Sequence, residues 1–174
     1  MSRPVPGDPA SLSACGATTS RAGARLAEDA ERARTAYRQL ADGWPGRTSV
    51  ATRRAGDALA QAATEVATEL VRGGAALQEC ATELAELAAR ARQTAERAAA
   101  LGLRVRSGRV ELAWGLTGEA SAAGAAEREA DRQRLQAELD AVATLARRRR
   151  DRLLTTLAGS TGTLVGVSDR VRAG

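Results

Sequence analysis

Histidine, lysine and phenylalanine are all missing from this chain of 174 residues, and aromatic residues make up only 2% of it. Without histidine there is no imidazole base, no serine–histidine or cysteine–histidine nucleophile pair and no histidine-ligated metal. Without lysine there is no Schiff-base amine and no phosphate-loop lysine. Two cysteines cannot hold a structural zinc ion unaided. Chemistry based on carboxylates is still allowed, but the acids alternate with arginine along the predicted helices, which is typical of solvated helix faces. We therefore expect no catalytic residue, no metal site, no cofactor and no small-molecule substrate.

Long apolar runs are also missing, since none approaches the roughly 20 residues of a transmembrane helix. Residues 1–7 lack the apolar core of a cleavable signal peptide. We expect a soluble chain that does not use the general secretory route, whereas a route that exports folded helical proteins remains open. The net charge of +5 is spread along the chain, so no segment is a strongly basic domain.

Alanine is the commonest residue, followed by arginine and leucine, and glutamate is the commoner of the two acids, a mixture typical of long helices. After an N-terminal arm, residues 1–8, a first helix is predicted over residues 9–42, with Asp8 as its cap and Pro9 at its first position. Apolar or small residues recur there in steps of three, four and seven, which predicts one buried stripe. Its members are Leu12, Cys15, Thr19, Ala22, Leu26, Ala33, Tyr37, Leu40 and Trp44.

A second helix is predicted over residues 49–101, where a heptad repeat is typical of coiled coils. One heptad position holds Leu59, Val66, Gly73, Cys80 and Leu87, and the other holds Ala63, Leu70, Leu77, Leu84, Ala91 and Ala98. Gly73-Gly74 weakens this helix. The pair marks either a kink or a place for a bulky side chain from an opposing helix.

The turn between the two helices is Trp44-Pro45-Gly46, because Pro45 bars a simple continuation of the first helix. An antiparallel hairpin then pairs residues whose numbers add to about 91, so that Leu26 meets Val66. The second helix extends well past the start of the first. Its outer part therefore carries apolar residues without a partner in the hairpin, namely Leu84, Leu87, Ala91 and Ala98.

Residues 102–118 form a connector in which apolar and polar residues alternate around Ser107-Gly108, which predicts a small β-hairpin or an ordered loop. A third helix follows over residues 119–158, with a stripe at Leu135, Leu139, Val142, Leu145, Ala146, Leu153 and Leu157. It either folds back over the second helix or acts as a dimerisation helix. Residues 159–174 are predicted to be a flexible tail. The predicted fold is all-α: a long antiparallel helical hairpin with a third long helix, in an elongated three-helix bundle.

The hairpin of residues 9–101, with Trp44 and Gly46 at its bend and Gly7-Asp8-Pro9 at its start, resembles the WXG family of small helical proteins. Members of that family are exported by type VII secretion in actinobacteria and their relatives. The resemblance implies a non-enzymatic protein that pairs with a protein partner, either a second copy or a similar hairpin protein, in a four-helix dimer. It also implies secretion without a cleavable signal, after a period in the cytoplasm.

Two features depart from this family. The expected export signal, Tyr-x-x-x-Asp/Glu after the second helix, is missing, because the single tyrosine, Tyr37, precedes the bend and is followed four residues later by Ala41. The chain also carries about 70 residues beyond the hairpin. We expect the partner to bind the two uncovered stripes, at Leu84, Leu87, Ala91, Ala98, Leu135, Leu139 and Val142.

Cys15 and Cys80 both fall on predicted inward stripes, and the hairpin register brings Cys15 within about one helical turn of Cys80. They form an interhelix disulfide in an oxidising compartment, or they remain two buried thiols. A separate feature is the run Arg147-Arg148-Arg149-Arg150, with Arg152 close by. It either binds nucleic acid or anionic lipid, or is a solvated helix face. Without interleaved aromatics for base stacking, the helix face is favoured.

Overall fold

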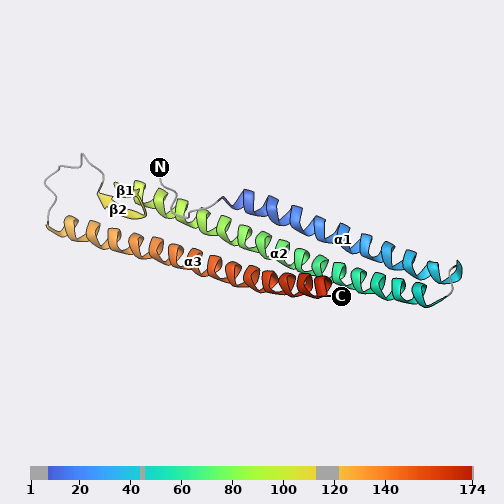
Figure 1. Ribbon diagram of the computed structural model, residues 1–174. Helices are drawn as coiled ribbons and strands as arrows, with labels where there is room; N and C mark the ends of the chain where they lie inside the picture. The colour runs from blue at the N-terminus through green and yellow to red at the C-terminus, as the bar shows by residue number, and fades with distance from the viewer. Residues whose placement is uncertain (1–7, 44–45, 113–121, 174) are drawn as a thin grey trace. The chain divides into compact units, whose positions relative to one another are not determined.

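The structure is a computed structural model that describes residues 8–43, 46–112 and 122–173. Within these ranges the chain forms three helices and one pair of short strands (Figure 1). The elements are α1 (Pro9–Gly43), α2 (Arg47–Ala100), β1 (Leu103–Arg106), β2 (Arg109–Leu112) and α3 (Ala122–Ala173). The predicted all-α fold with three long helices is confirmed, and the β-hairpin is the outcome observed for the connector.

The described elements belong to two compact units. The α1 unit combines Ala10–Glu79 with Leu153–Gly174, and the β unit combines Met1–Pro9 with Cys80–Arg152. Each unit thus contains a part of α2 and a part of α3. We describe the packing of each unit separately.

In the α1 unit, α1 and α2 run antiparallel and approach each other at glycines (Figure 1). A Cβ atom added to Gly16 would lie 2.6 Å from the carbonyl oxygen of Gly74, and one added to Gly23 would lie 2.7 Å from that of Ala67. The residue numbers of both pairs add to 90. The predicted register of the helical hairpin is therefore confirmed. Helices that touch at small residues bring their backbones close together, but each of these residues buries little area.

The contact stripe of α1 differs in phase from the predicted one. Gly16, Gly23 and Ala30, spaced by seven residues, are buried, whereas Cys15 and Ala22 are exposed. Cys15 and Ala22 were assigned to the stripe as apolar or small residues at helical spacing. In the structure, the space between the two backbones is too small for a side chain, so glycine takes the contact positions.

The predicted flexible tail is wrong, because α3 continues as a helix to Ala173. Glycine, serine and threonine have weak helix propensities, and this composition led to the prediction of a tail. Packing against α2 stabilises the helix here, since Leu157 faces Gly73, Arg170 pairs with Glu65, and Val167 is only 3% exposed. The predicted kink at Gly73-Gly74 is wrong, because α2 is an uninterrupted helix there. A Cβ atom at Gly73 would lie 3.6 Å from Leu157, an ordinary contact, whereas Gly74 is the glycine that packs against the backbone of α1.

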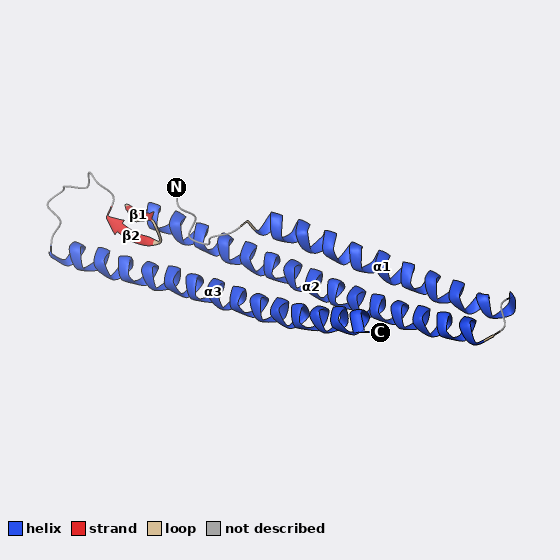
Figure 2. Ribbon diagram, in the orientation of Figure 1, coloured by secondary structure: helices blue, strands red, loops and turns tan. Residues whose placement is uncertain are grey.

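In the β unit, α2 ends at Ala100 and the chain turns into the antiparallel strands β1 and β2, drawn in red in Figure 2. Ser107 and Gly108 form the two-residue turn with φ values of 50° and 78°. Positive φ at both positions matches the twist of a tight hairpin and favours glycine. Leu103 and Val110 are 2% and 3% exposed, so the hairpin buries one apolar side. Trp114 and the predicted start of the third helix lie in 113–121, outside the described residues.

Candidate interaction surface

Of the predicted turn motif, Trp44 and Pro45 lie outside the described residues. Gly46 has a φ of 129°, a conformation that residues with a side chain rarely adopt. Its carbonyl oxygen accepts a hydrogen bond from the amide of Val50 at 3.2 Å, which joins the turn to the first turn of α2. The backbone conformation therefore favours glycine at this position, in addition to its place in the predicted motif.

The surface predicted to bind a partner is buried inside the β unit, which corrects that prediction. Relative exposures are 8% or less at all seven positions: Leu84, Leu87, Ala91, Ala98, Leu135, Leu139 and Val142. The first four come from α2 and the other three from α3. The stripes cover each other because α3 folds back along α2, the first of the two alternatives left open for the third helix.

Polar contacts at the edge of this buried seam hold the two helices in register. Glu138 of α3 accepts hydrogen bonds from Arg97 and from the hydroxyl of Thr94, the latter at 3.3 Å, and Thr94 is only 3% exposed. Farther along the same two helices, Arg149 of α3 pairs with Glu83 of α2 at 3.0 Å. These contacts between α2 and α3 are structural, since each charged group already has its partner.

Cys15 and Cys80 are both free thiols in the structure. Cys80 is 4% exposed, as predicted for an inward position, whereas Cys15 is exposed. The phase of the α1 stripe is the physical reason. Gly16 holds the contact position next to Cys15, which turns the Cys15 thiol away from the interface with α2.

The β-hairpin is fastened to α3 by one glutamine. Gln136 Oε1 accepts a hydrogen bond from the amide of Val110 at 2.8 Å, and its Nε2 donates to the carbonyl oxygen of Gly108 at 3.1 Å and to Asp140 at 2.9 Å. The recess beside these contacts has a volume of about 600 Å³. Both positively charged arginines and negatively charged carboxylates line it: Arg109, Glu111, Arg132 and Asp140. This balance of charge favours no class of ligand.

One carboxyl on α3 has an altered acidity. Arg132 donates to Glu129 at 2.8 and 2.6 Å, and Gln133 donates to it at 2.8 Å. These hydrogen bonds stabilise the charged carboxylate and lower the pKa of Glu129 to about 2. The same contact raises the pKa of Arg132. The group is open to solvent on a helix face, which is typical of a surface ion pair rather than of a catalytic acid.

The arginine run on α3 does not form one continuous basic surface. Arg147 and Arg148 are exposed, whereas Arg149 pairs with Glu83 and Arg150 is partly buried. The Nη2 atom of Arg150 is buried without a hydrogen bond to any described residue. Four consecutive residues point all round a helix, so this division between solvent and the α2 interface follows from the helical repeat.

An uncovered apolar groove lies in the α1 unit, next to the end of α3. The stripe by which α2 contacts α3 continues past Ala62 towards the start of α2. There Leu59 of α2 is 53% exposed and Val171 of α3 is 48% exposed. The groove has a volume of about 500 Å³ and is lined by Ala55, Ala58, Leu59, Gln61, Ala62, Glu65, Arg170 and Val171.

The groove was not predicted from the sequence, although the sequence contains a signal for it. Leu59 was placed on the heptad of the second helix. In a bundle of three helices, such a position must be covered by the third helix as well. The contact between Arg170 and Glu65 places the last described turns of α3 beside this part of α2.

Comparison with protein-family models, with curated proteins and with solved structures finds no match. The function proposed below therefore rests on the sequence and on the geometry of the structure. Among the described residues, no helix is long and apolar enough to cross a membrane, and no three metal-binding side chains form a cluster.

Proposed function

We propose that this protein is a non-enzymatic interaction protein that pairs with another helical protein, as a WXG-like component or substrate of type VII secretion. The observation that carries the proposal is the groove in the α1 unit. There α2 presents Ala55, Ala58 and Leu59, which are exposed, next to the buried Ala62. Apolar side chains at helical spacing and open to water gain free energy when another helix covers them, by roughly 25 cal/mol per Å².

The WXG-like assignment is supported by three features of the α1 unit. α1 and α2 form an antiparallel hairpin, their register is the one expected for a bend at residues 44–46, and Gly46 has a conformation that favours glycine. Because the Tyr-x-x-x-Asp/Glu signal is missing from the sequence, we propose that a partner provides the signal for export. The chain would then be secreted as part of a pair, after a period in the cytoplasm.

The direct test is sedimentation equilibrium of the chain, alone and mixed with a helical-hairpin protein encoded beside it. The proposal predicts a complex of fixed stoichiometry, and Leu59→Glu should weaken it by at least tenfold, because a charged side chain would be buried in an apolar seam. Leu154→Glu is the matched control, since Leu154 is 64% exposed on α3 and does not line the groove. A chain that stays monomeric with every such candidate would contradict the proposal.

A second candidate function is the binding of nucleic acid in the cytoplasm, favoured by Arg147, Arg148 and Arg152, which are exposed on α3. Salt separates the two candidates. Binding to phosphates should weaken by orders of magnitude between about 50 and 200 mM salt, whereas apolar helix pairing should change little. Fluorescence anisotropy with a labelled DNA duplex measures this. Tight, salt-sensitive binding that is lost in a triple Arg→Gln variant would favour the second candidate.

A further inference from the structure

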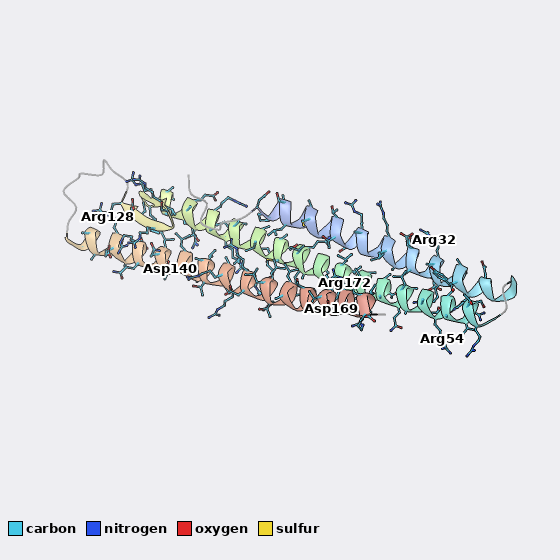
Figure 3. The ribbon with its side chains drawn as sticks, viewed as in Figure 1. Arg32, Arg54, Arg128, Asp140, Asp169 and Arg172 are labelled. Atoms are coloured by element: carbon cyan, nitrogen blue, oxygen red, sulfur yellow. The ribbon has the colours of Figure 1, made fainter. Side chains whose placement is uncertain are left out.

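The part of α3 that belongs to the α1 unit, Leu153–Ala173, is called the α3 arm below. Its residues are weak helix formers. From residue 155 to residue 168, eleven of fourteen are glycine, serine, threonine or valine, and none is charged. Asp169 and Arg172 follow in the last turns of the helix (Figure 3). Because these residue types are less favourable than alanine in a helix, the α3 arm depends on packing for its helical structure.

The apolar packing of the α3 arm on α2 is thin. Val167 is 3% exposed, but the three leucines at inward positions are only half-buried: Leu153, Leu157 and Leu164. Leu157 lies against Gly73, which has no side chain to pack on it. The ion pair of Arg170 with Glu65 has side chains that are 61% and 37% exposed, and such surface pairs add little stability.

Two polar atoms are buried in the same interface. Ser160 is 6% exposed, and its Oγ has no hydrogen bond to any described residue. It follows Leu157 by three residues, which places it on the side of α3 that faces α2. On α2, Glu69 precedes Gly73 by four residues, and its Oε2 is buried 3.4 Å from the guanidinium of Arg72 without a hydrogen bond. Burial of such groups opposes the closed position of the α3 arm, and water would satisfy them in an open one.

We infer that the α3 arm is a releasable cover, which opens from α2 as one unit while the β unit stays folded. Opening hydrates Ser160 and Glu69 and uncovers the stripe of α2 from Ala62 to Gly73. Partial openings of this kind occur in elements that have few buried apolar contacts. The contrast lies in α3 itself, because its part in the β unit buries Leu135 to 1% exposure. The inference concerns the chain alone and goes beyond the proposed function.

The test is native-state hydrogen exchange of the full chain, followed by NMR. Amides 157–166 should exchange at least about tenfold faster than amides 135–146 of the same helix, and with one common protection factor. Ser160→Ala should slow exchange in the α3 arm by about fivefold or more relative to Ser168→Ala, because it removes a buried hydroxyl that lacks a partner. Ser168→Ala is the matched control, since it makes the same change at a half-buried serine of the α3 arm. Glu69→Met should also slow exchange there.

Three outcomes would overturn the inference. Protection that falls steadily towards Ala173 would mean that the helix frays from its end and does not open as a unit. Faster exchange in Ser160→Ala would mean that this hydroxyl is hydrogen-bonded in solution and fastens the α3 arm. Equal protection of amides 157–166 and 135–146 would mean that the α3 arm stays closed. None of these results bears on whether a partner binds at Leu59, so the proposed function is tested separately.

Discussion

Gly16 of α1 and Gly74 of α2 pack backbone against backbone, and a Cβ atom added to either glycine would lie 2.6 Å from the carbonyl oxygen of the other. Real Cβ atoms essentially never come so close to another atom, and a carbonyl oxygen in a helix cannot move aside cheaply. The two helices therefore depend on the absence of side chains at this point. The contact depends on the small size of the residues that meet there and not on the burial of a large apolar area.

Gly74→Ala is expected to destabilise the protein. Overpacking costs about 1–3 kcal/mol of stability, which exceeds the gain of up to about 1 kcal/mol that alanine brings to a helix interior. Chemical denaturation followed by circular dichroism measures the change. Gly162→Ala in α3 is the matched control, since a Cβ there meets nothing within 4 Å. It should stabilise the helix by about 0.5–1 kcal/mol. Equal effects of the two substitutions would contradict the close packing of α1 on α2.

Gly56 provides a second test, because a Cβ there would lie within 2.6 Å of the ring of Tyr37. Gly56→Ala should therefore be destabilising when Tyr37 is present and neutral or stabilising when Tyr37→Ala has removed the ring. A double-mutant cycle should give a coupling of about 1–3 kcal/mol. Additive effects would mean that the ring does not rest on Gly56.

The phase of α1 explains what the sequence could and could not predict. Leu12, Leu26 and Tyr37 were assigned correctly to the contact side, since their apolar character follows the helical repeat. Gly16 and Gly23 were missed because hydrophobic patterning gives glycine little weight. The contact between backbones depends on residue volume, which a polarity pattern does not measure. Small residues spaced by seven were the available signal.

The end of α3 illustrates the same limit in another way. Propensity predicted a flexible tail after Ala158, yet Ser160, Leu164 and Val167 continue the buried stripe at steps of three and four. Local composition and tertiary packing disagree there, and packing decides the structure. Because the predicted tail is a helix, its residues Arg170 and Val171 line the candidate groove. That site could not be predicted from a flexible tail.

The buried seam of the β unit predicts a large effect at Leu84, which is 1% exposed. Leu84→Ala should destabilise the protein by about 2–5 kcal/mol, because it removes apolar contacts and leaves a cavity. Leu154→Ala, at a position that is 64% exposed, should change stability by less than about 0.5 kcal/mol. Urea unfolding of both variants provides the comparison. If Leu84→Ala were as mild as Leu154→Ala, α3 would not cover α2 in this region.

The ion pair at Glu129 predicts a pH dependence of defined sign. Its pKa is about 2 in the folded protein, against an ordinary value of 4.5. The contact with Arg132 is therefore stabilising above about pH 4.5, and that stabilisation is lost as the pH falls towards 2. Carbon-detected NMR of the Glu129 carboxyl should give a midpoint near 2, and Arg132→Gln should raise it. A midpoint near 4.5 in the unaltered chain would show that the carboxyl has no such partner.

The central claim is that α3 buries the stripe of α2 in the β unit, whereas Ala58 and Leu59 in the α1 unit are exposed and are the surface proposed to bind a partner. Alkylation rates of engineered thiols test it most directly, in a chain that carries Cys15→Ser and Cys80→Ala. Ala58→Cys should react rapidly in the chain alone and slowly once a partner helix is bound, whereas Ala91→Cys, at a position with 0% exposure, should react slowly in both states. Equal rates at the two positions in the chain alone, or a rate at Ala58→Cys that a bound partner does not change, would contradict it.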